Sequence, residues 1–331
     1  MLAEYFKLVR SFNLALTAIA PVLGALAMAP ENICCLALFV LFLIGACSHV
    51  YGFVLNDYLD VRVDKLTREL KDRPLVSGTI KKSASLKLAF SALLLSWILT
   101  LFFYQNLTQW LKLLLLLIIA DSLATVYNFT SKKLPAMDFS VACAVYFLII
   151  FGSATVSFNL TALAVIVALI GFAQVLYMNM INGGLKDIDH DWLANAKTVA
   201  VKLGTRVIGN NLKIPSGLKA CAYSIITFHA VLVFSPFVIA NLNFCYWQIA
   251  VLTVFLLLEI YFASKLLFMK KFNRQVIRKN IGLEVIFMYA LAPLVLSSIN
   301  VYISLLALVP PLGFVISNLV LHKSALKPKT M

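Results

Sequence analysis

Long apolar stretches separated by short polar segments dominate this chain. Stretches long enough to cross the roughly 30 Å hydrocarbon core of a bilayer occur at about 11–29, 33–55, 84–104, 109–128, 138–157, 160–181, 219–240 and 246–268. A further run, 283–321, is too long for one crossing and is interrupted near its middle by Asn300, so it is interpreted as two. The pattern predicts an all-α bundle of ten spans, and no low-complexity linker divides it into domains.

The polar residues that follow the second apolar stretch have a regular spacing. Asn56, Asp60 and Asp64 recur every four residues, so a helix places them on one face with about 6 Å of rise between neighbours. Side-chain oxygens in this arrangement suit Mg2+, which proteins usually hold with a few carboxylates and the phosphates of a substrate. The alternative is a solvated acidic helix end. That alternative is disfavoured because a membrane-length stretch precedes the motif and a dense basic loop follows it, with Arg62, Lys65, Arg68, Lys71 and Arg73.

A second acidic cluster follows the sixth apolar stretch. Asp187 and Asp191 are again four residues apart, on one face of a helix if the helix continues through them. Two such concentrations of like charge would repel each other unless cations lie between them. We therefore predict that a pair of Mg2+ ions, bridged by pyrophosphate, binds between the two clusters. The helical phase turns Asp57 and Asp189 away from these faces, so we expect them to reach the metals less directly.

Composition and charge distribution agree with a membrane protein. The 331 residues are 62% hydrophobic and only 13% charged, whereas soluble domains are about 25% charged. The net charge of +14 would suggest nucleic acid, but all of the 28 lysines and arginines except Lys112 fall in segments on one predicted side. The positive-inside rule makes that side cytoplasmic. The N-terminus and both acidic clusters are therefore predicted to be cytoplasmic, in a cell or inner membrane, with no nucleic-acid partner.

The first apolar stretch also resembles a signal peptide. Lys7 and Arg10 precede it, and Ala25-Leu26-Ala27 resembles a cleavage site. We expect the helix to be retained, because Arg10 and Asn13 then lie near the face that carries the acidic motif.

Taken together, the motifs resemble those of the UbiA superfamily of intramembrane prenyltransferases. The N-D-x-x-D-x-x-x-D motif is matched at 56–64, and the R-P-L-x-S-G motif at 73–78. D-x-x-x-D followed by K-T-x-A-V-x-L-G is matched at 187–204, and a tyrosine with a basic pair at Tyr127, Lys132 and Lys133. The resemblance covers about 5–300 of a single domain, 1–331. Members commonly have nine helices, so the bundle is expected to have nine or ten spans. Either the last span and basic tail, 301–331, are an addition to the pattern, or one of the two final spans is not a true crossing.

The resemblance implies a helical bundle around a central cavity that is open to lipid, with catalytic carboxylates Asp60, Asp64, Asp187 and Asp191. Two Mg2+ ions would be bound by Asn56, Asp60, Asp64, Asp187 and Asp191, and would hold the diphosphate of a polyprenyl donor. Breaking the allylic C–O bond sends negative charge onto pyrophosphate, so nearby cations stabilise the transition state. The candidate cations are Arg10, Arg73, Lys132, Lys133 and Lys197, with Asn13 and Tyr127 as further substrate-binding residues.

Several alternatives stay open. The hydrophobic or amphiphilic acceptor is either an aromatic quinone precursor or a lipid, such as the archaeal geranylgeranylglyceryl phosphate. A transporter would also have many spans, but the sequence lacks the paired broken helices typical of mid-membrane sites. A CDP-alcohol phosphotransferase would show D-G and A-R residues in one tight motif, which are absent. Polar residues within spans are costly and often functional, and Asp121, Glu259 and His49 are either functional or serve as helix-to-helix hydrogen bonds.

Overall fold

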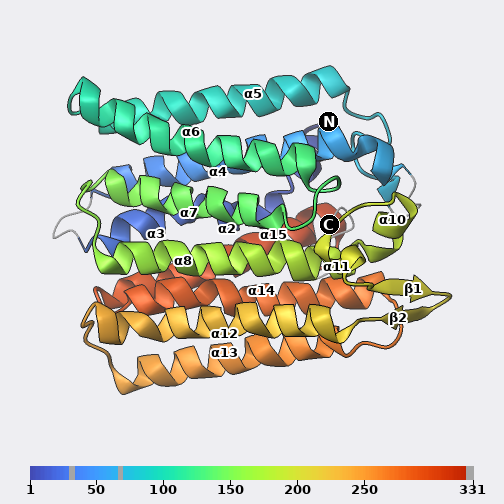
Figure 1. Cartoon of the computed structure of the whole chain (residues 1–331). Coiled ribbons are helices and arrows are strands. Elements are labelled where there is room, and N and C mark those ends of the chain that lie inside the picture. Colours follow the sequence, from blue (N-terminus) through green and yellow to red (C-terminus); the bar gives the residue numbers. More distant parts are fainter. Residues whose placement is uncertain (30–33, 66–69, 326–331) are drawn as a thin grey trace.

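The computed structural model describes residues 1–29, 34–65 and 70–325. Arg68 of the basic loop and Lys327 and Lys329 of the tail lie outside these ranges. Figure 1 shows an elongated bundle in which the long helices run side by side, with a small hairpin at one end. The N-terminal part is broken into three short helices, α1 (Leu2–Leu8), α2 (Ser11–Ala18) and α3 (Ala20–Ala27).

Long helices form the body of the bundle. In chain order they are α4 (Cys35–Asp64), α5 (Lys82–Leu99) with the 3-10 extension η2 (Thr100–Phe103), α6 (Leu107–Thr130), α7 (Asp138–Ala154), α8 (Ala162–Tyr177), α12 (Ser216–Ile239), α13 (Tyr246–Leu267), α14 (Arg274–Leu296), and η4 (Val301–Leu308) with α15 (Val309–His322). Shorter pieces join α8 to α12. They are the π-helix η3 (Met178–Gly183), α9 (Gly184–Lys186), α10 (Ile188–Leu193), α11 (Val199–Lys202), and the antiparallel strands β1 (Arg206–Ile208) and β2 (Asn211–Lys213).

The number of membrane spans is close to the prediction. Within the described ranges, 8 helices are long and apolar enough to cross a membrane, or 9 if the N-terminal pair, bent by 53°, counts as one span. The difference from ten arises at α7, which is apolar but has only 17 residues. The protein is therefore an integral membrane protein with a mostly helical fold. The sequence pattern did not predict the short β1–β2 hairpin.

The division of the last apolar run is confirmed. Helix α14 ends at Leu296, and Asn300 begins the next segment, where its side chain accepts a hydrogen bond from the Tyr302 backbone N–H. An asparagine that caps a helix start satisfies an amide that has no partner within the helix. Asn300 thus marks the turn between two antiparallel segments.

Close contact between α3 and α7 depends on glycine. A Cβ atom added to Gly24 would lie 2.0 Å from the carbonyl oxygen of Ile149, and one added to Gly152 would lie 1.9 Å from that of Pro21. Small residues let membrane helices approach closely where no hydrophobic effect drives them together. This contact ties the N-terminal segment into the centre of the bundle.

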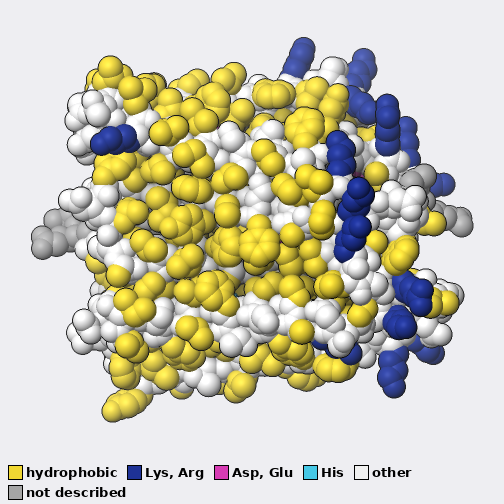
Figure 2. Space-filling model, in the orientation of Figure 1, with side chains coloured by type: hydrophobic (Ala, Val, Ile, Leu, Met, Phe, Trp, Pro, Cys, Tyr) yellow, Lys and Arg dark blue, Asp and Glu magenta, His cyan; other side chains and the backbone are white. Residues whose placement is uncertain are grey.

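The basic side chains gather at one end of the molecule. Figure 2 shows a broad hydrophobic belt on this face, with most lysines and arginines at the end that carries α10, α11 and the β1–β2 hairpin. The belt consists of exposed leucine, isoleucine and phenylalanine side chains on the long helices. Such a surface is suited to contact with the hydrocarbon core of a bilayer.

Candidate functional site

A cavity of about 260 Å³ lies between α2, α4, α6, α7, α8 and α14 near the basic end. Most of the residues that the sequence singled out line it: Arg10, Asn13, Asn56, Asp60, Asp64, Arg73, Tyr127, Lys132, Asp187 and Asp191. Lys133 and Lys197 do not line the cavity, and both are exposed. The fold therefore brings both acidic segments and most of the expected cations to one place.

The first acidic segment follows the predicted helical phase. Helix α4 continues through Asp64, and Asn56, Asp60 and Asp64 all line the cavity. Asp57 does not; it is buried and accepts a hydrogen bond from the Arg10 guanidinium, with Arg73 Nη1 3.6 Å from Asp57 Oδ1. Asp57 therefore holds two cations in place behind the cavity wall.

Arg10 is placed by the break between α1 and α2. Its backbone has φ 46°, in the left-handed region, which costs an ordinary L-residue about 1–2 kcal/mol. The ion pair with Asp57 and the packing of α2 against α4 offset this cost. The 53° bend thus turns the Arg10 side chain toward the cavity.

Arg73 is held by a compact loop. Its Nη1 donates to Asp64 Oδ2 at 2.5 Å, and the Ile80 N–H closes the loop onto the Pro74 carbonyl oxygen at 3.1 Å. Gly78 has φ +78°, a conformation that side chains disfavour, which explains the glycine that ends R-P-L-V-S-G. Burial alone would lower the pKa of Arg73, but the carboxylates of Asp57 and Asp64 raise it, so the guanidinium stays charged.

The second acidic segment is less regular than a continuous helix. The π-helix η3 precedes it, and the backbone breaks at Asp187 (φ −103°, ψ 6°), which separates α9 from α10. The Asp191 N–H still bonds to the Asp187 carbonyl oxygen at 2.9 Å, so the two side chains remain one turn apart and both line the cavity. π-Helical turns inside α-helices are frequent at functional sites.

Asp191 connects the second motif to the loop that follows α6. Lys132 Nζ donates to Asp191 Oδ1 at 2.6 Å, and Thr198 Oγ1 approaches Asp191 Oδ2 at 3.4 Å. The Lys197 N–H donates to the Lys132 carbonyl oxygen at 2.9 Å. Lys197 therefore supports the site through its backbone while its side chain points to solvent. Burial alone would lower the pKa of Lys132, but Asp191, Asp187 and Asp60 raise it, so this ammonium group stays charged.

Asp187 lies close to the positively charged Lys186 and to His190, neither of which the sequence motifs identified as a site residue. Lys186 Nζ is 3.4 Å from Asp187 Oδ2, and His190 Nε2 is 3.6 Å from Asp187 Oδ1. Burial alone would raise the pKa of Asp187, but Lys186, His190 and other nearby positive charges lower it well below the usual range, so the carboxylate is ionised. Lys186 lines the cavity and was missed as a site residue. Its position directly before Asp187 at the end of an apolar span was the available signal.

Asp189 faces elsewhere, as the helical phase predicted. It forms an ion pair with Arg274 and does not line the cavity. The Arg274 side chain also contacts His190 Nδ1, 3.2 Å from its Nη2. Asp189 thus anchors α10 to α14.

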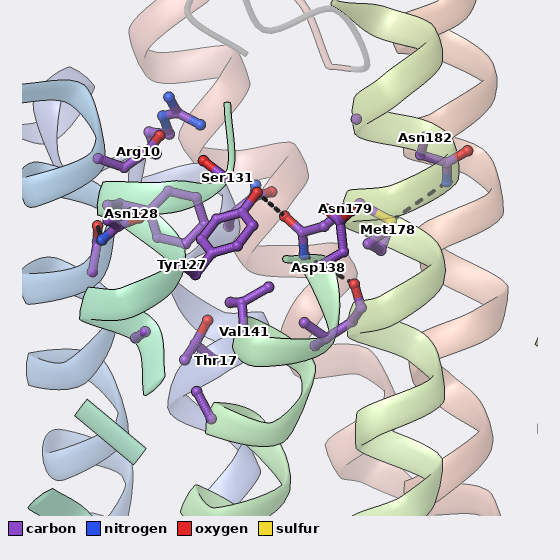
Figure 3. A pocket seen from close by; sticks show the side chains of 18 of the residues that line it. Arg10, Thr17, Tyr127, Asn128, Ser131, Asp138, Val141, Met178, Asn179 and Asn182 are labelled. Carbon is purple, nitrogen blue, oxygen red and sulfur yellow. Dashed lines mark hydrogen bonds between the residues drawn. The ribbon is translucent and has the colours of Figure 1, made fainter. Parts of the chain in front are cut away.

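The wall below the charged mouth is polar on one side and apolar on the other. Figure 3 shows Tyr127 pointing across the cavity toward Asn179, and the Tyr127 hydroxyl donates to Asn179 Oδ1 at 3.4 Å. Val141 lies on the wall nearby, whereas Asn182 turns away toward α14, where its Nδ2 donates to Glu284 Oε2 at 2.9 Å. Tyr127 therefore stands between the charged mouth and the apolar part of the cavity.

The three polar residues within the spans each have a side-chain partner. His49 Nε2 is 2.9 Å from the Val9 carbonyl oxygen, which only accepts, so Nε2 donates and Nδ1 accepts from Thr17 Oγ1 at 3.1 Å. Both ring nitrogens are thus used in tying α2 to α4. Glu259 lies outside the cavity, 3.1 Å from His229 Nδ1. His49 and Asp121 both line the cavity, and Asp121 accepts a hydrogen bond from Trp97 Nε1 at 3.0 Å.

The donor set suits a hard divalent cation. Within the described ranges, Asn56 and Asp60 line the cavity without a side-chain hydrogen bond or ion pair, while Asp64, Asp187 and Asp191 are each paired with Arg73, Lys186 or Lys132. No three acidic, histidine or cysteine side chains in the described part form a ready metal cluster. Carboxylate and amide oxygens fit Mg2+, and the paired carboxylates would exchange their cationic partners for the metal.

Comparison with known proteins gives a consistent result. Residues 18–291 match the sequence model of the UbiA prenyltransferase family. The 4-hydroxybenzoate octaprenyltransferase of Vesicomyosocius okutanii is 32% identical over 184 residues, covering 55% of this chain and 64% of that protein. The digeranylgeranylglyceryl phosphate synthase of Thermococcus kodakarensis is 24% identical over 256 residues, covering 71% and 86%. The match thus spans less than two thirds of the first relative.

Solved structures share the fold. A UbiA homolog from Aeropyrum pernix K1, in its apo form, aligns with TM-score 0.67 at 14% identity over 87% of this chain and 97% of that one. A UbiA homolog from Archaeoglobus fulgidus bound to GPP and Mg2+ aligns with TM-score 0.62 at 18% identity over 89% and 99%. At these identities the likeness concerns the fold alone.

The position of Asp57 leads to a stability prediction. Asp57→Asn removes the buried charge between Arg10 and Arg73, so we expect a loss of about 3 kcal/mol, as for breaking other buried ion pairs from one side. Thermal unfolding of the purified protein in detergent would show it as a lower Tm. Asp72→Asn is the matched control, because Asp72 is an exposed aspartate directly before Arg73. Equal Tm values for the two variants would show that Asp57 does not hold the cations.

Proposed function

This chain belongs to the UbiA prenyltransferase family, and on that premise we propose that it transfers a polyprenyl group from a polyprenyl diphosphate to an acceptor within the membrane, with release of pyrophosphate. The observation that carries the proposal is the convergence of two acidic segments and several buried cations at the mouth of a cavity with an apolar wall. Such a site accommodates an anionic head and a lipid-soluble tail at the same time.

The mouth is the proposed diphosphate site. Arg10, Arg73, Lys132 and Lys186 all line it. Bound Mg2+, in the proposal two ions, would be held by Asn56, Asp60, Asp64, Asp187 and Asp191 and would neutralise charge on the leaving pyrophosphate. A structural neighbour from Archaeoglobus fulgidus is bound to GPP and Mg2+, which supports this assignment.

The proposed transfer begins with cleavage of the donor and ends with attack by the acceptor. The allylic C–O bond breaks with both electrons passing to the pyrophosphate oxygen, and Arg73 and Lys132 stabilise the developing charge because they are fixed beforehand by Asp64 and Asp191. The acceptor's nucleophilic atom then bonds to the allylic carbon, and its proton passes to the released pyrophosphate or to water at the mouth of the cavity. Val141, Val145 and Leu148 line the apolar wall and keep water from the reactive carbon.

The acceptor is proposed in two versions. An aromatic quinone precursor is favoured by similarity to the 4-hydroxybenzoate octaprenyltransferases, and a glycerol-based lipid by the longer alignment with the digeranylgeranylglyceryl phosphate synthase. Incubating the purified protein and Mg2+ with labelled geranylgeranyl and longer diphosphates, against 4-hydroxybenzoate and geranylgeranylglyceryl phosphate, would identify the acceptor from the labelled product. A transporter, the alternative class, would give no product with any pair.

Metal dependence is the first prediction of this proposal. Because the carboxylates act on the donor through Mg2+, chelation with EDTA should abolish donor binding and pyrophosphate release together, and added Mg2+ should restore both. Equilibrium dialysis with labelled donor and a pyrophosphate assay would measure the two. Turnover that survives EDTA would contradict the assignment.

The second prediction concerns the carboxylates that face the cavity. Asp60→Ala, Asp64→Ala, Asp187→Ala and Asp191→Ala should each remove nearly all prenyl transfer, because each loses a proposed metal ligand. Asp189→Ala should be milder, since Asp189 faces Arg274 and not the cavity. Initial rates at saturating Mg2+ would be compared with the amount of folded protein. Near wild-type turnover in Asp60→Ala, or equal damage in Asp189→Ala and Asp187→Ala, would require a different ligand set.

The third prediction concerns the orientation of the protein in the membrane. We propose that the basic end of the bundle, with the N-terminus and both acidic motifs, is cytoplasmic, because positive charges are retained on that side. Single cysteines that replace Lys71 and Lys202, in a variant without the native cysteines, should react with an impermeant maleimide only from the cytoplasmic side. A cysteine replacing Lys112 is the control and should react from the opposite side. The reverse pattern would overturn the orientation.

A further inference from the structure

A second polar group lies in the cavity wall, away from the charged mouth. Ser48 on α4 is eight residues before Asn56, and Asp121 on α6 is six residues before Tyr127. Helical rise places them about 12 Å and about 9 Å deeper than those residues. Both side chains line the same cavity. A carboxyl group at this depth, within a membrane span, needs a functional or structural reason.

The known contacts of Asp121 use only part of its hydrogen-bonding capacity. Trp97 Nε1 on α5 donates to Asp121 Oδ2 at 3.0 Å, which fixes the carboxyl group. The Ser48 side chain also interacts with this carboxyl group, although its oxygen makes no hydrogen bond of standard geometry within the part of the chain that the structure describes. A carboxyl group can accept several hydrogen bonds, and an indole N–H needs only one acceptor oxygen. Asp121 and Ser48 thus keep hydrogen-bonding capacity for another molecule.

There is room for such a molecule between this pair and the mouth. Gly52 lies on α4 between Ser48 and Asn56, and a Cβ atom added to it would meet nothing within 4 Å. Ala124 lies between Asp121 and Tyr127 on α6 and also lines the cavity. Small residues therefore leave open the path from the diphosphate site to the polar pair. His49, the neighbour of Ser48, has both ring nitrogens occupied and does not compete for a ligand.

We propose that Ser48 and Asp121 form the acceptor subsite, in which Asp121 accepts a hydrogen bond from a hydroxyl group of the acceptor and Ser48 bonds to the same group. This inference rests on the proposed prenyl transfer and specifies its substrate class as a hydroxyl-bearing acceptor. A phenol and a glycerol both supply such a group. An acceptor that presents a carboxylate or phosphate here would leave two anionic groups facing each other, so its anionic part belongs at the cationic mouth.

The test uses binding of acceptors and of their methyl ethers, which lack the hydroxyl hydrogen. Wild-type protein should bind 4-hydroxybenzoate about tenfold more tightly than 4-methoxybenzoate in equilibrium dialysis, as expected for one buried hydrogen bond. Asp121→Asn keeps an oxygen for Trp97 and should lose this preference, as should Ser48→Ala. The same comparison with a glycerol-based lipid and its methyl ether identifies which source of the hydroxyl is used.

Donor measurements separate this inference from the proposed function. The variants should keep the donor affinity within about twofold, while the KM for acceptor rises about tenfold. Glu259→Gln is the matched control, because Glu259 is an equally buried carboxyl group outside the cavity. If Asp121→Asn still bound the hydroxyl acceptor more tightly than its methyl ether, with or without a lower Tm, the proposal would be wrong. Asp121 would then only link α5 to α6 through its hydrogen bond with Trp97. Wild-type protein that binds hydroxyl acceptors selectively but transfers no prenyl group would instead refute the proposed function.

Discussion

The structure depends on pairing buried carboxylates with buried cations at one end of a membrane bundle. Unpaired charges at such depth are costly, and several of these acidic side chains are paired with cations from elsewhere in the fold. Asp57 and Asp64 hold Arg10 and Arg73, and Asp191 holds Lys132. These partners come from the N-terminal helix break and from loops after α4 and α6. The ion pairs consequently fix segments that are far apart in sequence around a single cavity.

The same pairs explain how a structural network also serves a reaction. A diphosphate offers the cations a new anionic partner, and a divalent metal offers the carboxylates a new cationic one. In the proposed function both exchanges would conserve charge pairing, so substrate and metal would enter without leaving a buried charge uncompensated. The groups also need little reorganisation, because Arg73 and Lys132 are already held where charge would develop.

Irregular backbone brings the side chains to these positions. The left-handed residue Arg10 turns the N-terminal helix, the π-helix η3 and the break at Asp187 set the second motif, and Gly78 closes the Arg73 loop. Most of the other long helices are continuous, because lipid cannot satisfy exposed backbone groups, although α12 and α14 each contain an internal proline and η2 and η4 are 3-10 segments. Departures from regular helix therefore concentrate where the protein lines its cavity and where it meets water.

By itself the sequence determined the features that are local along the chain. Span length requires only hydrophobicity, and the separation of Asp60 and Asp64 from Asp57 requires only the helical period. Tertiary structure decided which loop cations reach the cavity, because a lysine in a loop has no fixed phase. Lys197 follows the second motif yet contributes only its backbone N–H, whereas Lys186, in no motif, lines the cavity. The proposed subsite of Ser48 and Asp121 likewise depends on where α4 and α6 meet, a relation between helices that no single stretch of sequence encodes.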